Sequence, residues 1–317
     1  MILVTGAAGK TGRSVLRGLA AGGAATRGLV RAPAQAAALI AQGVGEVVVG
    51  DLTAADDLAR ACAGVHTIYH ICPNMHPQEA AIGGRLIAAA QAAGVARLVY
   101  HSVLHPQTEA MAHHWQKLRV EELLLQSGLA WAVVQPAAYM QNVLANWPEV
   151  VATGVYRVPY APGTRLGMVD LADVAAAVTR ILLDPGLDCG MYELAGRGAL
   201  TQDEVAAQMA AHLGRPVRCE AVDRAAWAAA ARGRGMNEYA VTTLLAMFEY
   251  YEQYGFWGSP FVLAQLLGRP PVTFADFLAR EGTLQQTADG AHAADSRGAI
   301  QKQIREYPPN PPNPRAI

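Results

Sequence analysis

The first 135 residues alternate between short β-branched runs and helical stretches, and this alternation constrains the fold more than any other feature of the sequence. Strands joined by helices run parallel through right-handed crossovers, so such a chain forms a doubly wound sheet with helices on both faces. The strands are continuous apolar runs, as expected when both faces are buried. The predicted strands are Ile2–Thr5, Thr26–Val30, Glu46–Val49, Thr67–Ile71, Arg97–Ser102 and Trp131–Gln135, with helices near 13–20, 33–42, 55–62, 78–93 and 110–127. The sequence therefore predicts the α/β fold class with a doubly wound parallel sheet.

The stretch "MILVTGAAGKTG" has three glycines directly after the first predicted strand and at the start of a helix. Gly6 permits a tight turn, Gly9 lets the backbone approach a pyrophosphate, and Gly12 lets the helix pack closely on the strand. The anion would bind the free N–H groups at the helix N-terminus. A glycine turn without a ligand is the alternative, whereas the spacing of the Gly-Lys-Thr does not match the phosphate loop of nucleotide triphosphatases. The pattern predicts a Rossmann dinucleotide site with the cofactor-binding candidates Thr5, Gly6, Gly9, Lys10, Thr11 and Gly12.

The end of the second predicted strand decides which dinucleotide is preferred. An acidic residue there would bind the ribose hydroxyls of NAD, but "TRGLVRAP" offers Arg27 and Arg31 and no carboxylate. Arg31 stands at the end of the strand and is the better candidate to bind a 2′-phosphate, with a solvated surface arginine as the alternative. Asp51 and Leu52 follow the third strand, where Asp51 lies beside the adenine or caps the next helix. The predicted cofactor is therefore NADPH/NADP+.

The regular alternation fades after the sixth predicted strand, which indicates a second part of the chain. A helix at Leu171–Leu183 and a strand at Met191–Leu194 follow, and then Thr201 and Glu204 form a capping box that opens another helix. Residues 224–254 form an aromatic helical stretch. We expect an NADP-binding domain over 1–150 with strand contributions from 151–200, a smaller, mainly helical C-terminal substrate lobe over 200–281, and an extended, mobile tail over 282–317.

The composition is that of an ordinary soluble globular protein, with 52% apolar residues, 16% charged residues and a formal net charge of −1. Without a basic excess, nucleic acid and anionic membranes are not expected partners. We expect a cytoplasmic protein, because we find no leader-like N-terminus and no run of about 18 apolar residues that could span a membrane. His70, Asn74 and His76 have no acidic partner close by in the sequence, so no metal site is predicted. The sequence does not decide the oligomeric state, and a homodimer is one alternative.

Several further stretches occur in a familiar order. "ILVTGAAGKTG", "VR" at the end of the second strand, "GDL" after the third and "GVARLVYHSV" are followed by "KLRVEELLLQSGLAWAVVQPAAYMQN", "DLADVAAAV" and "LLGRPPVTFADFLARE". From residue 1 to about 280, this series resembles the NmrA-like family of atypical short-chain dehydrogenase/reductases. The resemblance implies an NADP-binding Rossmann domain with a small C-terminal lobe that closes over the nicotinamide. The family contains reductases of quinones, dyes and phenylpropanoid-like compounds, and also cofactor-binding regulators that catalyse nothing.

The resemblance also points to the helix after the fifth strand as a source of catalytic residues. In ordinary short-chain dehydrogenases, a Tyr-x-x-x-Lys pair on this helix moves the proton, and its lysine binds the nicotinamide ribose. Lys117 matches that lysine, with a surface lysine as the alternative, while His113 stands in place of the tyrosine. Residues i and i+4 share a helix face, so both side chains can point into one pocket, and a histidine can donate a proton near neutral pH. The alternative is that the adjacent His114 faces inward instead.

Further candidates follow the fifth and sixth strands, where ligands bind in open α/β sheets. His101 and Ser102 are candidates to orient the substrate, although a serine at this position is also common in turns. The resemblance implies that Pro136 lies near the nicotinamide and that Tyr139 lies on the substrate side. Tyr139 could then be the missing phenolic proton donor, or an aromatic residue that packs at the junction with the lobe.

The leading hypothesis is an NADPH-dependent reductase that transfers hydride to an aromatic or conjugated small molecule, such as a quinone, enone or imine. The aromatic residues of the C-terminal lobe motivate the choice of an aromatic substrate. A non-catalytic NADP(H) sensor that binds a protein partner is one alternative, motivated by the missing tyrosine. A redox-neutral isomerase or cyclase that retains its cofactor is the other.

Overall fold

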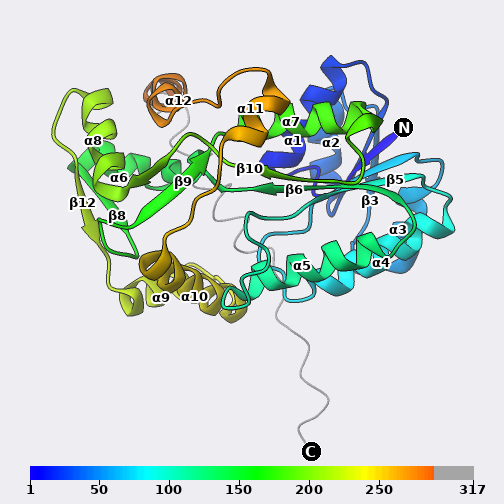
Figure 1. Cartoon of the computed structure of the whole chain (residues 1–317), viewed down its shortest axis with the longest axis horizontal. Coiled ribbons are helices and arrows are strands. Elements are labelled where there is room, and N and C mark those ends of the chain that lie inside the picture. The colour runs from blue at the N-terminus through cyan, green and yellow to red at the C-terminus, as the bar shows by residue number, and fades with distance from the viewer. Residues whose placement is uncertain (289–317) are drawn as a thin grey trace, which may run out of the picture.

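The centre of the molecule is a seven-stranded sheet in which all strands run parallel (Figure 1). The computed structural model describes residues 1–288. The strand order is β10-β6-β5-β4-β1-β2-β3, so the direction in which the chain crosses the sheet reverses between β1 and β4. The strands are β1 (Ile2–Val4), β2 (Thr26–Val30), β3 (Glu46–Val49), β4 (Thr67–His70), β5 (Arg97–His101), β6 (Ala130–Pro136) and β10 (Gly190–Leu194). The predicted α/β fold class is confirmed.

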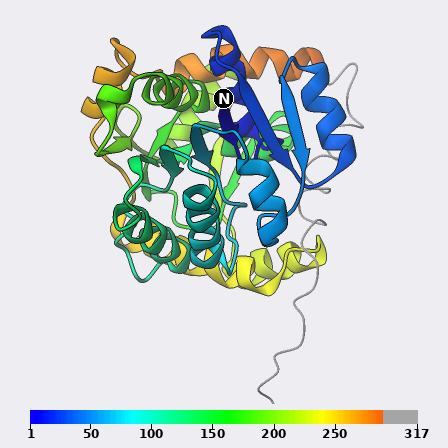
Figure 2. The same cartoon turned by 90° about the vertical axis from the view of Figure 1, so that its right-hand side faces the viewer.

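Helices cover both faces of this sheet, as expected for a doubly wound fold. In Figure 1, α1, α2, α7 and α11 lie above the sheet and α3, α4 and α5 lie below it. Figure 2, turned by 90° so that the N-terminus faces the viewer, shows helices above and below the strands again. Their bounds are α1 (Lys10–Ala21), α2 (Pro33–Ala41), α3 (Ala55–Cys62), α4 (Glu79–Ala92), α5 (Ala112–Leu125), α7 (Leu171–Leu183) and α11 (Phe261–Leu267).

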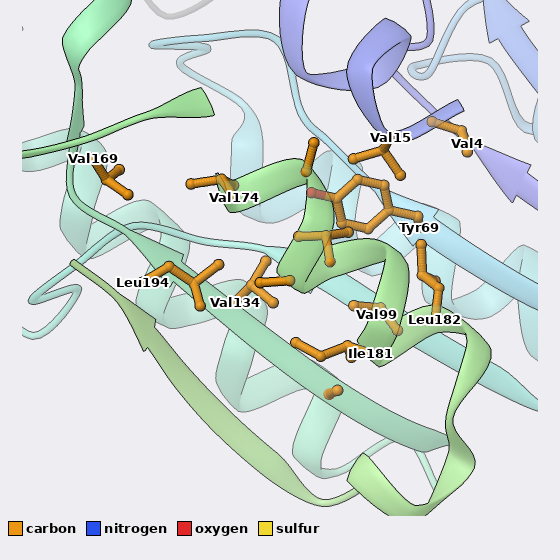
Figure 3. Packing of buried hydrophobic residues seen from close by; sticks show 14 of the residues in the cluster. Val4, Val15, Tyr69, Val99, Val134, Val169, Val174, Ile181, Leu182 and Leu194 are labelled. Carbon is orange, nitrogen blue, oxygen red and sulfur yellow. The ribbon is translucent and has the colours of Figure 1, made fainter. Parts of the chain in front are cut away.

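Two apolar layers, one on each face of the sheet, hold these helices in place. Figure 3 shows the layer under α1 and α7, where Val15 and Val174 pack on strand residues such as Val99. The layer under α3, α4 and α5 contains Leu86 and the next strand residue, Tyr100. Successive strand residues therefore face opposite layers. Each fully buried aliphatic side chain contributes about 1.5–3 kcal/mol, so these layers dominate the stability of the domain.

The C-terminal part forms a smaller, mainly helical lobe at the carboxyl end of the sheet, as predicted (Figure 1). Its helices are α6 (Trp147–Thr153), α8 (Gln202–Leu213), α9 (Arg224–Gly233), α10 (Glu238–Tyr254) and α12 (Phe274–Ala288), and the 3₁₀ helix η1 (Met140–Asn146) precedes α6. A second 3₁₀ helix, η2 (Pro185–Leu187), connects α7 to β10 of the central sheet. Two small sheets, ordered β11-β9-β7 and β12-β8, were not predicted. Their strands are β7 (Ala138–Tyr139), β8 (Val155–Val158), β9 (Arg165–Val169), β11 (Ala199–Thr201) and β12 (Arg218–Ala221).

The last helix corrects the predicted start of an extended tail at residue 282. Phe274, Phe277 and Leu278 pack into the core of the lobe, and α12 continues from them to Ala288. Extending a helix that is already formed costs far less than starting one, so the polar residues after this buried turn stay helical. The extended conformation predicted for 282–288 is therefore wrong, and the remainder of that prediction, 289–317, lies outside the described residues.

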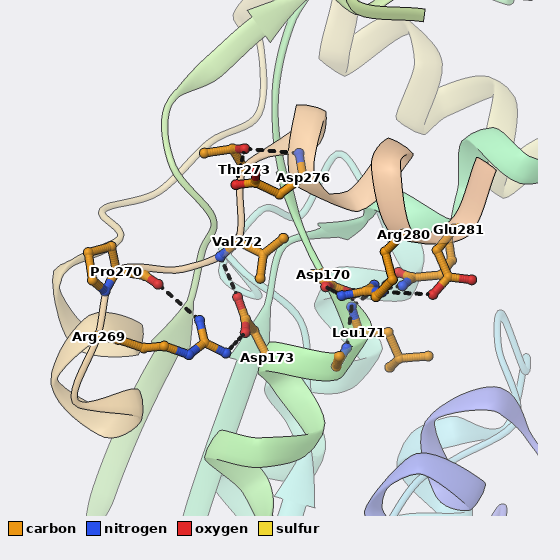
Figure 4. A network of polar contacts seen from close by, with 12 residues as sticks. Asp170, Leu171, Asp173, Arg269, Pro270, Val272, Thr273, Asp276, Arg280 and Glu281 are labelled. Atoms are coloured by element: carbon orange, nitrogen blue, oxygen red, sulfur yellow. Dashed lines mark hydrogen bonds and ion pairs between the residues drawn. The ribbon is translucent and has the colours of Figure 1, made fainter. Parts of the chain in front are cut away.

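Two buried aspartates at the start of α7 tie the lobe to the sheet domain (Figure 4). Asp170 accepts the N–H of Ala172 as the cap of α7, and Arg280 of α12 donates to the same carboxylate at 2.7 Å. Asp173 accepts a hydrogen bond from Arg269 at 2.5 Å. Bonds between charged groups are about twice as strong as neutral ones. The lobe is therefore held against the sheet by ion pairs as well as by apolar packing.

Candidate functional site

The glycine turn lies at the point where the strand order reverses, which is where open α/β sheets bind ligands. Gly6 has φ +58°, and a Cβ there would lie 3.0 Å from the carbonyl oxygen of Ile71, just after β4. The hydroxyl of Thr5 accepts the N–H of Ile71 at 2.9 Å and donates to its carbonyl at 3.0 Å. A Cβ at Gly12 would collide with the carbonyl of Gly6. The turn therefore requires glycine at both positions and is tied to β4.

Among the residues that the structure describes, no side chain accepts the N–H groups of the first turn of α1. Gly9 is the N-cap residue, no side chain caps the helix, and the first turn contains no acidic residue. Lys10, the first helical residue, is exposed. The unpaired N–H groups, the helix dipole and the charge of Lys10 all favour a bound anion. The geometry therefore fits the pyrophosphate of a dinucleotide.

Arg31 and Asp51 lie close together beyond the ends of β2 and β3. Asp51 accepts two hydrogen bonds from Thr53, one from the N–H and one from the hydroxyl, each 2.7 Å long. Burial raises the pKa of Asp51, but these two bonds and the positive charge of Arg31 outweigh burial and leave the pKa below its ordinary value. Arg27 is used elsewhere, since it pairs with Glu46 and donates to carbonyls at the end of α3. Arg31 is thus an exposed cation at the predicted position of the 2′-phosphate.

Both β4 and β5 end in a tyrosine followed by a histidine, Tyr69-His70 and Tyr100-His101. Because successive strand residues point to opposite faces, the tyrosine and the histidine of each strand lie on different faces of the sheet. On the α1 and α7 face, the Tyr69 hydroxyl lies 2.6 Å from His101 Nδ1, and His101 Nε2 lies 2.9 Å from the Tyr139 hydroxyl. Thr11 of the glycine turn donates to Tyr139 at 3.3 Å. Burial, followed by the charge of Lys117, lowers the pKa of His101 to about 3, so its imidazole is neutral. We call Tyr69, His101, Tyr139 and Thr11 the neutral chain.

The other face carries a charged group of residues around the buried Glu79 of α4. Lys117 donates to Glu79 Oε1 at 2.5 Å, and the Tyr100 hydroxyl donates to the same oxygen at 2.9 Å. The ring of His70 stacks on Tyr100 at 5.6 Å between centroids, and burial lowers the pKa of His70 to about 3. We call Glu79, Lys117, Tyr100 and His70 the charged cluster. Lys117, the predicted ligand of the nicotinamide ribose, therefore has a carboxylate partner that the sequence analysis missed.

Ser102 lies on the same face of the sheet and is bonded to Glu121 of α5. Its buried hydroxyl donates to the Glu121 carboxylate, and the amide of Gln135 donates to both carboxylate oxygens at 3.0 and 3.2 Å. Burial raises the pKa of Glu121, although both hydrogen-bonding partners oppose this effect. Ser102 thus holds Glu121 in place, and its role in orienting a substrate stays a prediction.

His113 and His114 are both buried at the start of α5, with their ring centroids 4.4 Å apart. His114 also packs edge-on against Phe256 of the C-terminal lobe. Burial, and then the neighbouring His114 and Lys117, lower the pKa of His113 to about 2. Burial therefore keeps the imidazole of His113 neutral near pH 7, and its role as a proton donor stays a prediction. Its Nδ1 atom has no hydrogen-bond partner among the described residues.

The remaining candidates lie at the edges of the site. Pro136 ends β6, which lies two strands from β4 and so two strands from the reversal between β4 and β1, and Leu52 is buried in the apolar layer under α3, α4 and α5. Sequence reasoning gave no role to Tyr69 or Glu79. The Tyr-His sequence at the ends of both β4 and β5 was a usable signal for Tyr69. Because these parallel strands are neighbours, each face of the sheet receives a tyrosine from one strand and a histidine from the other. Glu79 opens a helix and carried no such signal.

Two findings concern the described residues as a whole. In that part of the chain, no group of three or more His, Cys, Asp or Glu side chains is arranged to hold a metal ion. No helix there is long and apolar enough to cross a membrane.

The chain is similar to two reductases over most of its length. It is 31% identical over 279 residues to the NAD(P)H azoreductase of Xenophilus azovorans, which covers 87% of this chain and 96% of that protein. It is 31% identical over 280 residues to quinone oxidoreductase 2 of Escherichia coli, with 87% and 96% covered. A solved structure of the NADPH-dependent quinone oxidoreductase of Escherichia coli, complexed with NADPH, has a TM-score of 0.79 at 29% identity and covers 88% of this chain and 99% of that chain. The model of the NmrA-like family matches residues 1–275, and the chain therefore belongs to the NmrA-like family, as the resemblance implied.

Proposed function

We propose that the protein is an NADPH-dependent reductase that transfers a hydride to an aromatic or conjugated small molecule, such as a quinone. The observation that carries the proposal is the 3.3 Å hydrogen bond between Thr11 and Tyr139, because it brings a phenol next to the turn that fits a dinucleotide. The similarity to an azoreductase and a quinone oxidoreductase supports the same class of reaction.

Three groups of the chain would hold the cofactor. The uncapped first turn of α1, after Gly9, would bind the pyrophosphate through its N–H groups. Arg31 would pair with the 2′-phosphate. An ammonium group has three N–H donors, so Lys117 can bond the nicotinamide ribose while it stays paired with Glu79. When bound, NADPH supplies the hydride.

Tyr139 is the proposed proton donor. Its hydroxyl lies at the outer end of the neutral chain, and the residue is only partly buried. Burial raises the pKa of Tyr139 above its ordinary value, with the hydrogen bond from Thr11 opposing this effect. The phenol therefore keeps its proton at neutral pH and gives it to a strong base, such as the oxyanion that forms when a quinone is reduced.

The cofactor assignment is tested by measuring NADPH and NADH binding through the fluorescence of the reduced nicotinamide. Arg31→Ala is expected to weaken NADPH binding about ten- to hundredfold, because one charge-assisted contact is lost, and to leave NADH binding unchanged. Arg119→Ala, which removes an exposed arginine of α5, is the matched control and should change neither affinity. Equal weakening of NADPH and NADH in Arg31→Ala would refute the 2′-phosphate assignment.

Turnover is tested by following the loss of NADPH absorbance with a panel of quinones, enones, aldehydes and imines. The proposal predicts NADPH loss with at least one conjugated class and much slower loss of NADH. Tight NADPH binding without consumption by any acceptor would instead favour a cofactor sensor, and product formation without NADPH loss would favour a redox-neutral enzyme.

A further inference from the structure

We infer that Tyr69 and His101 orient the hydrogen bonds of the neutral chain so that the hydroxyl proton of Tyr139 points toward the substrate. The inference rests on the proposed function and adds two positioning residues to it. Neither side chain is proposed to touch the substrate, since both act through Tyr139.

The direction of the chain is set at its buried end, by Tyr69. This residue has no exposed surface, and Figure 3 shows its ring among the valines under α1 and α7. Within the described part of the chain, its hydroxyl has a single hydrogen-bond partner, His101 Nδ1, at 2.6 Å. A buried hydroxyl that does not use its proton costs about 1–3 kcal/mol. Tyr69 therefore donates, and Nδ1 accepts.

The tautomer of His101 follows from this direction. A neutral imidazole carries one N–H, so when Nδ1 accepts a hydrogen bond, the proton resides on Nε2. Nε2 lies 2.9 Å from the oxygen of Tyr139 and donates to it. The hydroxyl of Thr11 donates to the same oxygen at 3.3 Å. With two donors on its oxygen, Tyr139 keeps its own O–H for an acceptor outside the chain.

This arrangement suits reductions that need a proton. A quinone takes up a hydride and one further proton, and the O–H bond of Tyr139 breaks as the new O–H bond forms on the quinone oxygen. The phenolate left behind is stabilised by His101 Nε2–H and the Thr11 hydroxyl, and water then returns the proton. A cationic triphenylmethane dye needs only the hydride, which neutralises its central carbon. Its reduction therefore does not depend on the proton of Tyr139.

The tautomer can be tested directly in the protein without cofactor, by nitrogen NMR with labelled histidine. The His101 signals are assigned as those absent from His101→Gln. The inference predicts a neutral imidazole protonated at Nε2 in the wild type, and loss of this single tautomer in Tyr69→Phe. A wild-type imidazole protonated at Nδ1 would overturn the inference, whether or not the protein reduces any acceptor.

The consequence for chemistry is tested by comparing a quinone with a cationic triphenylmethane dye. Tyr69→Phe and His101→Gln are expected to lower kcat for the quinone by at least about tenfold, with KM and dye reduction little changed. Tyr156→Phe removes an equally buried hydroxyl that is bonded to Gln202 in the lobe, and it should affect neither acceptor. Equal losses with both acceptors, or no loss with either, would contradict the inference. If the wild type reduces neither acceptor, the proposed function fails, and the tautomer still decides the inference.

Discussion

The neutral chain and the charged cluster lie on opposite faces of the same two strands, β4 and β5. Each contains one tyrosine from one strand and one histidine from the other. In the charged cluster, Lys117 and Tyr100 converge on the fully buried carboxylate of Glu79 at 2.5 and 2.9 Å. In the neutral chain, every member is uncharged, and the series ends at the partly buried Tyr139 next to the glycine turn. The difference comes from the partner that a neighbouring element supplies, a glutamate from α4 on one face and a tyrosine from β7 on the other.

Because of this difference, we expect the two groups of residues to have different roles. A buried ion pair keeps its position because removing either partner leaves an uncompensated charge, so we expect the charged cluster to dominate local stability and to hold Lys117 for the cofactor. In the neutral chain, loss of one proton leaves a phenolate at the partly buried Tyr139, where His101 and Thr11 bond its oxygen. We therefore expect the neutral chain to matter more for proton transfer than for folding.

The largest expected effect is acid destabilisation, and it concerns both faces. Burial lowers the pKa values of His70 and His101 to about 3, of His113 to about 2 and of His114 to about 4. The unfolded chain binds protons at these histidines below about pH 6.5, whereas the folded chain does not. The free energy of unfolding should therefore be highest above pH 6.5 and fall toward pH 4, by up to about 1.4 kcal/mol per pH unit for each histidine.

Urea unfolding at pH 7, 6 and 5 measures this slope. His70→Gln and His101→Gln should each lower this slope by the equivalent of about one bound proton, because each variant removes one buried neutral histidine from one face. A wild-type stability that does not change between pH 7 and 5 would show that these histidines are not held neutral by the fold.

The next largest effect should come from the charged cluster alone. Glu79→Gln leaves the Lys117 ammonium buried without a counter-ion and should lower the free energy of unfolding by about 3–5 kcal/mol. The double variant Glu79→Leu with Lys117→Met removes both charges and should recover most of this loss in urea unfolding at pH 7. If the double variant is as unstable as Glu79→Gln, packing rather than charge determines the stability of this face.

The smallest expected effect comes from removing one tyrosine hydroxyl from each face. Tyr100→Phe removes a hydrogen bond to a carboxylate, which is worth about 1.5–3 kcal/mol, whereas Tyr69→Phe removes a neutral bond worth about 1 kcal/mol. Urea unfolding of the two variants under the same conditions should therefore rank Tyr100→Phe as the less stable protein. The reverse order would mean that the neutral bond of Tyr69 contributes more to the free energy of unfolding than the bond of Tyr100 to the carboxylate.

The sheet domain could be predicted closely because its signals are local. β2 and β3 have the bounds expected from sequence. Gly6 and Gly9 precede α1 and Gly12 lies in its first turn, as expected, since β-branched runs and glycines at a strand end respond to backbone geometry alone. β8, β9 and β12 were not predicted. They have four or five residues, and their pairing joins segments far apart in the chain, which no local pattern records.

The candidate site divides in the same way. Arg31 could be found because its position at the end of a strand follows from the fold class. Glu79 could not, because it pairs with Lys117, a residue of another helix that lies 38 positions further along the chain. The lowered pKa of His113 could not be predicted for a related reason. It depends on burial and on the neighbouring His114 and Lys117, and sequence reasoning had no measure of that burial.

A reductase consumes its cofactor, so the stoichiometry of a single reaction distinguishes net reduction from cofactor binding alone. Purified protein is mixed with NADPH and a conjugated quinone, and the NADPH consumed is compared with the hydroquinone formed in the absence of oxygen. We expect one NADPH to be consumed for each hydroquinone formed, and this reaction to be lost in Tyr139→Phe. NADPH that binds tightly and is not consumed, with no hydroquinone formed from any quinone of the panel, would contradict net reduction.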